Sequence, residues 1–119
     1  MSPRSARMSK KSPQTVTKRE LVQRIADRSG QTKVLVREVV QSFLDEMATE
    51  LVRGNRLEFR KFGVFEVRRR PGRIAQNPKT LERVEVPDKR VVRFKVGNLL
   101  RRMVDEERID LIDGLRDRD

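Results

Sequence analysis

Residues 68–80, RRRPGRIAQNPKT, are the stretch of this chain least suited to a packed core, yet they lie between two segments that alternate like strands. The stretch carries two prolines and a concentration of basic side chains, and its few apolar residues follow no regular pattern. A two-stranded extension is too thin to hold a core, so it is stable only against a partner or as a mobile element. We therefore interpret the stretch as a basic arm.

Two amphipathic helices are predicted before the strands. Thr17 and Glu20, in the sequence TKRE, match a capping box that starts a short helix, and Gly30 ends it. Thr32 starts a second helix of about five turns, and Gly54 ends it. The apolar face of the second helix is wide enough to pack on the first helix and on a second subunit. Its residues follow helical spacing: Leu35, Val36, Val39, Val40, Phe43, Leu44, Met47 and Leu51.

Period-two alternation then predicts strands on both sides of the basic stretch. Two short strands turn near residues 61–63, and strand character resumes after the arm. Gly97 and Asn98 open a short last helix. Four of the five phenylalanines fall in the strand region, and we interpret them as core residues rather than base-stacking ones. The apolar strand residues are Leu57, Phe59, Phe62, Val64, Phe65, Val67, Val84, Val86, Val91, Val92 and Phe94.

Charge and composition indicate the class of partner. The 119 residues carry a net charge of +11, which favours a polyanion, with nucleic acid ahead of an anionic membrane surface. Only 35% of the residues are hydrophobic, so a monomeric core would be thin and oligomerisation is favoured. The absence of cysteine and histidine excludes disulfides and catalysis by those side chains. No apolar run is long enough to span a bilayer and no signal core is present, so we expect a cytoplasmic protein.

Three regions are predicted along the chain. Residues 1–14 contain four basic and no acidic side chains and are interpreted as a disordered basic arm or a passive tail. Residues 15–104 form the folded domain. Residues 105–119 contain seven acidic and three basic side chains. We favour a merely solvated acidic extension, with competition against DNA as the alternative; the apolar residues among them suggest that part of it is helical.

Three motifs together resemble the HU/IHF family of bacterial histone-like DNA-bending proteins. LEFRKFGVFEVRRR is similar to the strand–turn–strand of that family, with its F-G-x-F core at Phe62, Gly63 and Phe65. QNPKT, residues 76–80, resembles the signature at the tip of the family's arm, and RVVRFKVGNLL resembles the last strand and helix start. The intervals from Gly63 to Pro78 and from Pro78 to Phe94 agree with the family without a gap. The resemblance covers about residues 17–104, and NPKT and RVVRF lean towards the IHF branch.

The resemblance implies an α+β fold in an intertwined dimer. A helical hairpin would precede a three-stranded antiparallel sheet with a long β-hairpin arm and a short C-terminal helix. Two arms, one from each subunit, would enter the minor groove of double-stranded DNA and bend it. From the residues alone Pro78 is equally an ordinary turn residue, whereas the resemblance favours an intercalating wedge. The implied DNA-binding residues are Lys18, Arg60, Lys61, Arg68, Arg69, Arg70, Arg73, Gln76, Asn77, Pro78, Lys79 and Arg93.

The chain departs from the family pattern near the tip and at the last helix. Ala75 and Gln76 stand where the family has glycine and arginine, and Leu81 replaces a glycine. Val96 stands where the family often has proline or a small residue, and Asn98 replaces a lysine that contacts phosphate. The arginines of residues 68–73 are expected to make up for these lost contacts.

The predicted function is therefore architectural: compaction or organisation of the nucleoid by a non-enzymatic protein. We expect no cofactor, no metal, no small-molecule substrate and no membrane partner. A homodimer is expected, with a heterodimer as the alternative, because a different partner subunit would not appear in one chain. The alternative function is structural RNA binding, which the basic charge also allows.

Overall fold

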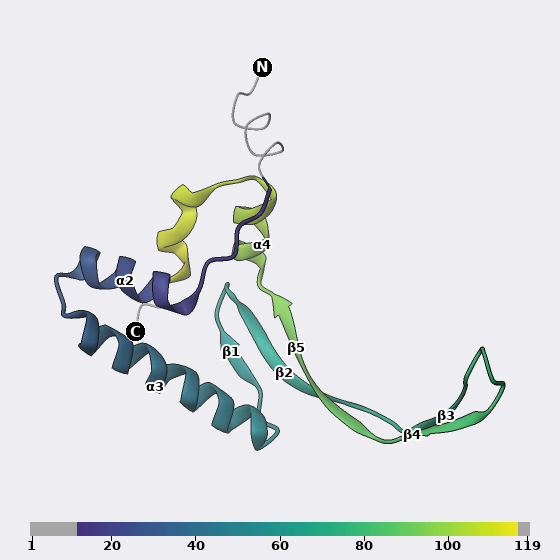
Figure 1. Cartoon of the computed structure of the whole chain (residues 1–119). Coiled ribbons are helices and arrows are strands. Elements are labelled where there is room, and N and C mark those ends of the chain that lie inside the picture. The colour runs from purple at the N-terminus through teal and green to yellow at the C-terminus, as the bar shows by residue number, and fades with distance from the viewer. Residues whose placement is uncertain (1–11, 117–119) are drawn as a thin grey trace. The chain divides into compact units, whose positions relative to one another are not determined.

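The structure is a computed structural model that describes residues 12–116 (Figure 1). The chain divides into two compact units after Leu44. Most of the basic N-terminal segment predicted over residues 1–14 lies outside the described residues, as do residues 117–119 at the end of the acidic extension.

The first unit contains α2 (Lys18–Ser29) and the N-terminal part of α3 (Lys33–Val52). The Thr17 hydroxyl accepts a hydrogen bond from the backbone N–H of Glu20 at 3.3 Å, which confirms the Thr17 half of the predicted capping box. The Thr32 hydroxyl accepts from the backbone N–H of Leu35 at 3.1 Å in the same way. Both helices therefore begin where a side-chain oxygen satisfies an otherwise unpaired N–H group.

The core of the first unit is small. Val22, Ala26 and Val36 are buried, and Ile25 and Val40 pack against them. The rest of the apolar face that was predicted for α3 stays in contact with solvent in a single chain. Its exposed members in this unit are Leu35, Val39, Phe43 and Leu44.

The second unit contains an antiparallel sheet in the order β1-β2-β5. Its strands are β1 (Leu57–Phe59), β2 (Gly63–Arg70) and β5 (Lys89–Val96). The register places Phe65 opposite both Leu57 and Phe94. The ring centroids of Phe65 and Phe94 lie 4.7 Å apart, and those of Phe59 and Phe65 lie 6.0 Å apart. The strand phenylalanines therefore form one aromatic cluster on the sheet, although Phe94 is still 41% exposed.

The arm consists of two consecutive strand pairs rather than one (Figure 1). The β2–β5 ladder ends at the pair Arg70–Lys89. A second antiparallel pair, β3 (Arg73–Gln76) and β4 (Arg83–Val86), begins at Arg73–Val86. We call the first pair's outer end, residues 68–70 and 89–91, the arm stem, and β3, β4 and the turn between them the outer arm.

Helix α4 (Asn98–Asp105) follows β5 and packs against a further helical turn. The carbonyl of Lys61 accepts from the backbone N–H of Leu100 at 3.1 Å, which joins the β1–β2 turn to the start of α4. Residues Ile109–Leu115 form a 3-10 helix, η1, which we call the C-terminal cap. A Cβ atom at Gly114 would lie 2.7 Å from Leu99, so the cap approaches α4 closely. This part of the acidic extension is folded against the domain.

The order of elements confirms the predicted α+β fold. A helical hairpin precedes a three-stranded antiparallel sheet, a long β-hairpin arm and a short C-terminal helix. The sequence patterns did not specify two features. One is the interruption of the arm at residues 71–72 and 87–88, and the other is the packed C-terminal cap.

Candidate nucleic-acid interface

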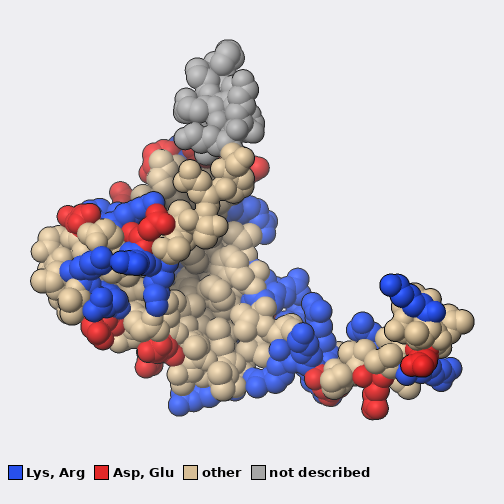
Figure 2. Space-filling model, viewed as in Figure 1, with Lys and Arg blue, Asp and Glu red and all other residues tan. Residues whose placement is uncertain are grey.

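The arm stem places basic side chains directly opposite one another. In the β2–β5 register Arg69 faces Arg90 and Arg70 faces Lys89, while Arg68 faces Val91. Figure 2 shows Lys and Arg side chains gathered along the stem and again at the outer end of the arm, with acidic side chains between them. Like charges directly across an antiparallel pair destabilise it. A bound polyanion would therefore reduce the repulsion between cations in the stem.

The sequence patterns did not single out Lys89 and Arg90 as site residues. Their place in the stem follows only from the strand register, because β5 returns alongside β2 and sets these two cations against residues 69 and 70. Pairing the two basic runs as a hairpin would have found them, since RRR directly precedes Pro71 and KR directly follows Pro87-Asp88.

The tip of the outer arm is a compact turn organised by Asn77. Its side-chain oxygen accepts from the backbone N–H of Lys79 at 2.9 Å, and its backbone carbonyl accepts from the N–H of Leu81 at 2.8 Å. The backbone N–H of Asn77 donates to the carbonyl of Glu82 at 2.8 Å, which closes the turn. Pro78 is thus held between two fixed backbone positions, and its side chain is exposed.

Leu81 occupies the position where a glycine was expected, and its backbone shows why glycine suits it. Its φ of 62° lies in the left-handed region, and its side chain is 68% exposed. A left-handed conformation costs a non-glycine residue roughly 1–2 kcal/mol. The Gln76 side chain donates to the Leu81 carbonyl at 3.2 Å, so a predicted DNA-binding residue helps to hold this turn.

Arg69 forms hydrogen bonds across the arm. Its guanidinium Nε donates to Asp88 Oδ2 at 3.1 Å, and its Nη2 binds the same oxygen. The backbone N–H of Gly72 donates to the other carboxylate oxygen, Oδ1. The hydrogen bond from Arg69, followed by that from Gly72, holds the pKa of Asp88 below its ordinary value.

Three further predicted residues lie in the second unit but away from the outer arm. Arg60 and Lys61 are in the β1–β2 turn, at the opposite end of β2 from the stem. Arg93 lies within the β2–β5 ladder opposite Glu66, whose carboxylate is 3.4 Å from Lys95 Nζ and 3.8 Å from Arg68 Nη1. The structure therefore brings the arm residues together and sets these three along the body of the sheet.

Lys18 belongs to the first unit and lines a groove of about 440 Å³ between α2 and α3. Its ammonium group donates to the side-chain oxygen of Gln41. Arg19, Lys33 and Arg37 line the same groove, and the sequence patterns did not identify them as binding residues. Lys33, Arg37 and Gln41 recur every four residues, which is the spacing that places them on one face of α3.

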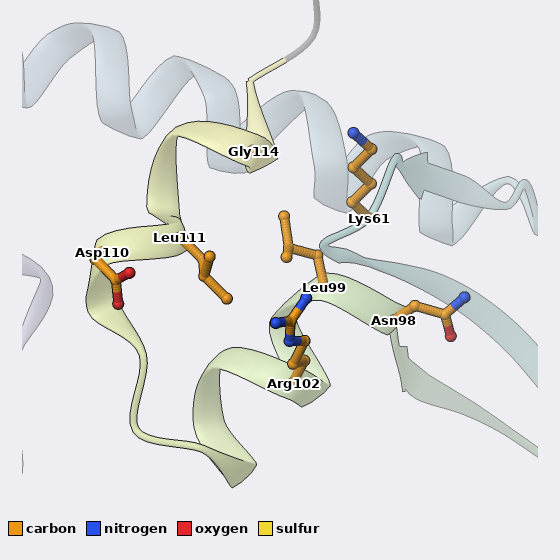
Figure 3. A pocket seen from close by; sticks show the side chains of 7 residues that line it. All are labelled: Lys61, Asn98, Leu99, Arg102, Asp110, Leu111 and Gly114. Carbon is orange, nitrogen blue, oxygen red and sulfur yellow. The ribbon is translucent and has the colours of Figure 1, made fainter.

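A pocket of about 630 Å³ separates α4 from the C-terminal cap (Figure 3). Leu99 and Leu111 point into the space between the two elements, and Lys61, Asn98 and Arg102 complete its lining with Asp110 and Gly114. The acidic side chains of this segment pair locally: Glu106 lies 3.3 Å from Arg102, and Arg108 binds Asp110 through two bonds of 2.9 Å. Those bonds from Arg108 hold the pKa of Asp110 below its ordinary value.

Over residues 12–116 no cluster of three or more acidic side chains is arranged to hold a metal ion. Within the same residues, every helix is too short or too polar to cross a bilayer. All twelve predicted DNA-binding residues are exposed.

Comparisons with known proteins agree with this arrangement. Residues 16–105 match the family described as Bacterial DNA-binding protein. The chain is 44% identical over 91 residues to integration host factor subunit beta of Nitrosomonas eutropha, covering 76% of this chain and 87% of that protein. It is 46% identical over 97 residues to the same subunit of Neisseria meningitidis, covering 76% of this chain and 92% of that protein.

Solved structures give the same result. A chain of the Anabaena HU–DNA cocrystal structure aligns with a TM-score of 0.67 and 35% identity, covering 75% of this chain and 97% of that one. A mutant of HU from Thermotoga maritima aligns with a TM-score of 0.56 and 27% identity, covering 75% of this chain and 99% of that one. The chain therefore belongs to the bacterial DNA-binding protein family, the family of HU and integration host factor.

Proposed function

We propose that this protein binds double-stranded DNA through the minor groove as a dimer, with one β-arm from each subunit, and bends it by inserting Pro78 between base pairs. Its biological role on this proposal is to compact or organise the nucleoid. The observation that carries the proposal is the arm stem, where Arg70 faces Lys89 on a strand pair too thin to bury them.

The physical reason is that the stem is costly without a partner. Each like-charged cross-strand pair weakens the hairpin, whereas each phosphate that a cation neutralises releases a condensed counterion. The narrow minor groove concentrates negative potential, and arginine is the side chain best suited to it. A basic hairpin therefore gains the most binding free energy from a polyanion whose groove matches the width of the hairpin.

The arrangement of the tip supports the role of Pro78. It is exposed at the end of the arm, and the hydrogen bonds of Asn77 fix the backbone on either side of it. Insertion of apolar side chains between base steps from the minor groove is the known mode of HU and IHF, so this step is taken from the family.

The dimer is supported by the apolar surface that one chain leaves open. Val39, Phe43 and Leu44 of α3 are each at least 39% exposed. Phe62 in the β1–β2 turn is 38% exposed, and Phe94 in β5 is 41% exposed. Only four hydrophobic residues are buried among the described residues. A chain with so little buried apolar area gains stability by covering these faces with a second copy. We propose a homodimer on this ground.

The test is the substitution Pro78→Ala. Removing the apolar ring is expected to reduce the bend, seen as lower energy transfer between dyes at the two ends of a linear duplex, while affinity falls less. The bend changes because unstacking needs a rigid wedge, whereas the phosphate contacts that dominate affinity remain.

Lys79→Ala is the matched control in the same turn. It removes a charge and no wedge, so it should weaken binding, lower the salt dependence of log K by about one unit of slope, and preserve the bend at saturation. Pro78→Ala complexes with the same energy transfer as the wild type would show that Pro78 is only a turn residue.

A further inference from the structure

The arm is interrupted at one place where both strands carry a proline. Between the pairs Arg70–Lys89 and Arg73–Val86, each strand contributes two residues outside either ladder. These residues are Pro71 and Gly72 on one strand and Pro87 and Asp88 on the other. Proline has no N–H group to donate, so the backbone cannot continue the ladder through this point.

The carboxylate of Asp88 bridges the interruption. One oxygen accepts from the Gly72 backbone N–H across the gap, and the other accepts from the Arg69 guanidinium on the last part of β2. A single side chain thus joins the strand that leads into β5 to residues on both sides of Pro71. We call Arg69, Gly72 and Asp88 the arm clasp.

The backbone at Gly72 fits this contact closely. A Cβ atom there would lie 2.8 Å from the Val86 carbonyl and 3.0 Å from Asp88 Oδ1. Any larger residue would therefore displace either the carboxylate or the opposite strand. The clasp depends on a glycine at this position as well as on the charge of Asp88.

The clasp is not an ordinary surface ion pair. Arg69 and Asp88 have side chains that are 69% and 54% exposed, and exposed pairs contribute little to global stability. However, its three hydrogen bonds lie at the one point of the arm where backbone pairing is missing. Because no backbone pairing fixes the arm at this point, these hydrogen bonds set the direction of the outer arm relative to the stem.

We propose that Asp88 is a positioning residue for DNA bending, which aims the outer arm and Pro78 by clasping the two strands where the ladder is interrupted. This inference rests on the proposed function and deepens it. It also assigns Arg69 to arm geometry in place of the DNA contact predicted for it.

The test compares Asp88→Ala with Glu85→Ala in a bending assay with end-labelled duplex. Both substitutions remove one negative charge from the arm, but Glu85 lies in β4 opposite Ile74, outside the clasp. Removing a negative charge near DNA should leave affinity unchanged or tighten it. For Asp88→Ala we expect the energy-transfer change on binding to fall to about half or less, with affinity lowered by less than about threefold, because an exposed ion pair is weak.

Glu85→Ala is expected to retain the wild-type bend. A loss of bending in Asp88→Ala that Glu85→Ala does not share cannot come from the lost charge, because both variants lose one negative charge from the arm. Wild-type bending by Asp88→Ala, or an equal loss of bending in Glu85→Ala, would overturn the proposal.

A second measurement needs no DNA and separates the clasp from the proposed function. In amide ¹⁵N–¹H spectra of the free protein, Asp88→Ala should shift the Gly72 resonance strongly, and Glu85→Ala should leave it in place. An unmoved Gly72 resonance in Asp88→Ala overturns the clasp, whatever the DNA experiment shows. A wild-type protein that binds duplex without bending it contradicts the proposed function, even if the Gly72 resonance moves as expected.

Discussion

Asp88 and Asn77 show how single side chains replace backbone hydrogen bonds in the arm. Asn77 accepts from Lys79 at the tip, and Asp88 accepts from Gly72 at the interruption. Asn and Asp side chains commonly bind nearby backbone N–H groups in this way, and they favour turns for that reason. Two short polar side chains therefore determine where the arm turns and where it is joined.

The pKa of Asp88 provides a test at this scale. Because Arg69 and Gly72 stabilise the carboxylate, its pKa in the folded protein is lowered from the ordinary value of 3.8. The clasp is therefore fully formed above pH 3.8 and is lost only as the pH falls through the lower, folded-state pKa. In an NMR titration the Gly72 amide and the Asp88 carboxyl carbon should shift together, with a midpoint below that of an ordinary aspartate.

Arg69→Ala provides the control for this titration. Removing the first of the two hydrogen-bonding partners should raise the midpoint towards the ordinary value, while the Gly72 amide still follows Asp88. A wild-type midpoint at the ordinary value, or a Gly72 amide that ignores the titration, would contradict the hydrogen bonds described for the clasp.

Residue-scale features were predictable where their partners are close in sequence. Thr17 and Thr32 cap helices within three residues, so TKRE and the threonine before the second helix were sufficient. Asp88 was not found, because Gly72 and Arg69 lie 16 and 19 residues away across the hairpin. No local pattern marks an aspartate that acts across an interrupted ladder.

At the scale of elements, the C-terminal cap adds to the family domain, whose match ends at residue 105. The cap approaches α4 closely where Gly114 meets Leu99, and the half-buried side chains of Leu99 and Leu111 line the pocket between the two elements. Carboxylates in and just before the cap pair with nearby arginines, as in Arg102–Glu106 and Arg108–Asp110. The structure therefore favours a packing role for this segment over a free acidic tail.

Deletion of residues 106–119 should lower the thermal stability of the protein. Uncovering Leu99 and removing Leu111 forfeits apolar burial of about 1 kcal/mol or more, and 1 kcal/mol shifts Tm by roughly 4–8 °C in a domain of this size. Calorimetry of the full and truncated chains measures the difference directly.

Asp113→Asn is the control for the charge of the segment, because it removes an exposed carboxylate and preserves the cap. It should leave Tm unchanged within experimental error, since its pair with Arg116 is exposed. Identical melting of the truncated and full-length proteins would contradict a packing role for the cap.

The element boundaries could be predicted from the apolar periodicity and from the glycines that end the helices. The predicted helices end near Gly30 and Gly54, and the structure has α2 ending at Ser29 and α3 at Val52. The division of the arm into two strand pairs was not predicted, because it depends on Pro71 lying across from Pro87 and Asp88. Such a coincidence becomes visible only when the register is known.

At the scale of the whole molecule, the composition already limited the class of partner and the size of the core. A net charge of +11 and a small apolar fraction predicted a polyanion-binding chain with too little core to stand alone. The structure agrees, with four buried hydrophobic residues among those it describes and broad apolar exposure on α3. The composition does not identify the partner subunit, because a different subunit would not appear in one chain. It does not give a DNA sequence preference either, because backbone contacts and DNA deformability dominate the proposed mode of binding.

The most direct test of DNA bending by this protein is the end-to-end distance of a linear duplex that the wild-type chain saturates. Energy transfer between terminal dyes, with the number of bound chains counted by light scattering, measures bending and stoichiometry in one sample. We predict a clear rise in energy transfer with two chains on each bent site. Saturating binding that leaves the energy transfer of the free duplex unchanged would contradict the proposed bending.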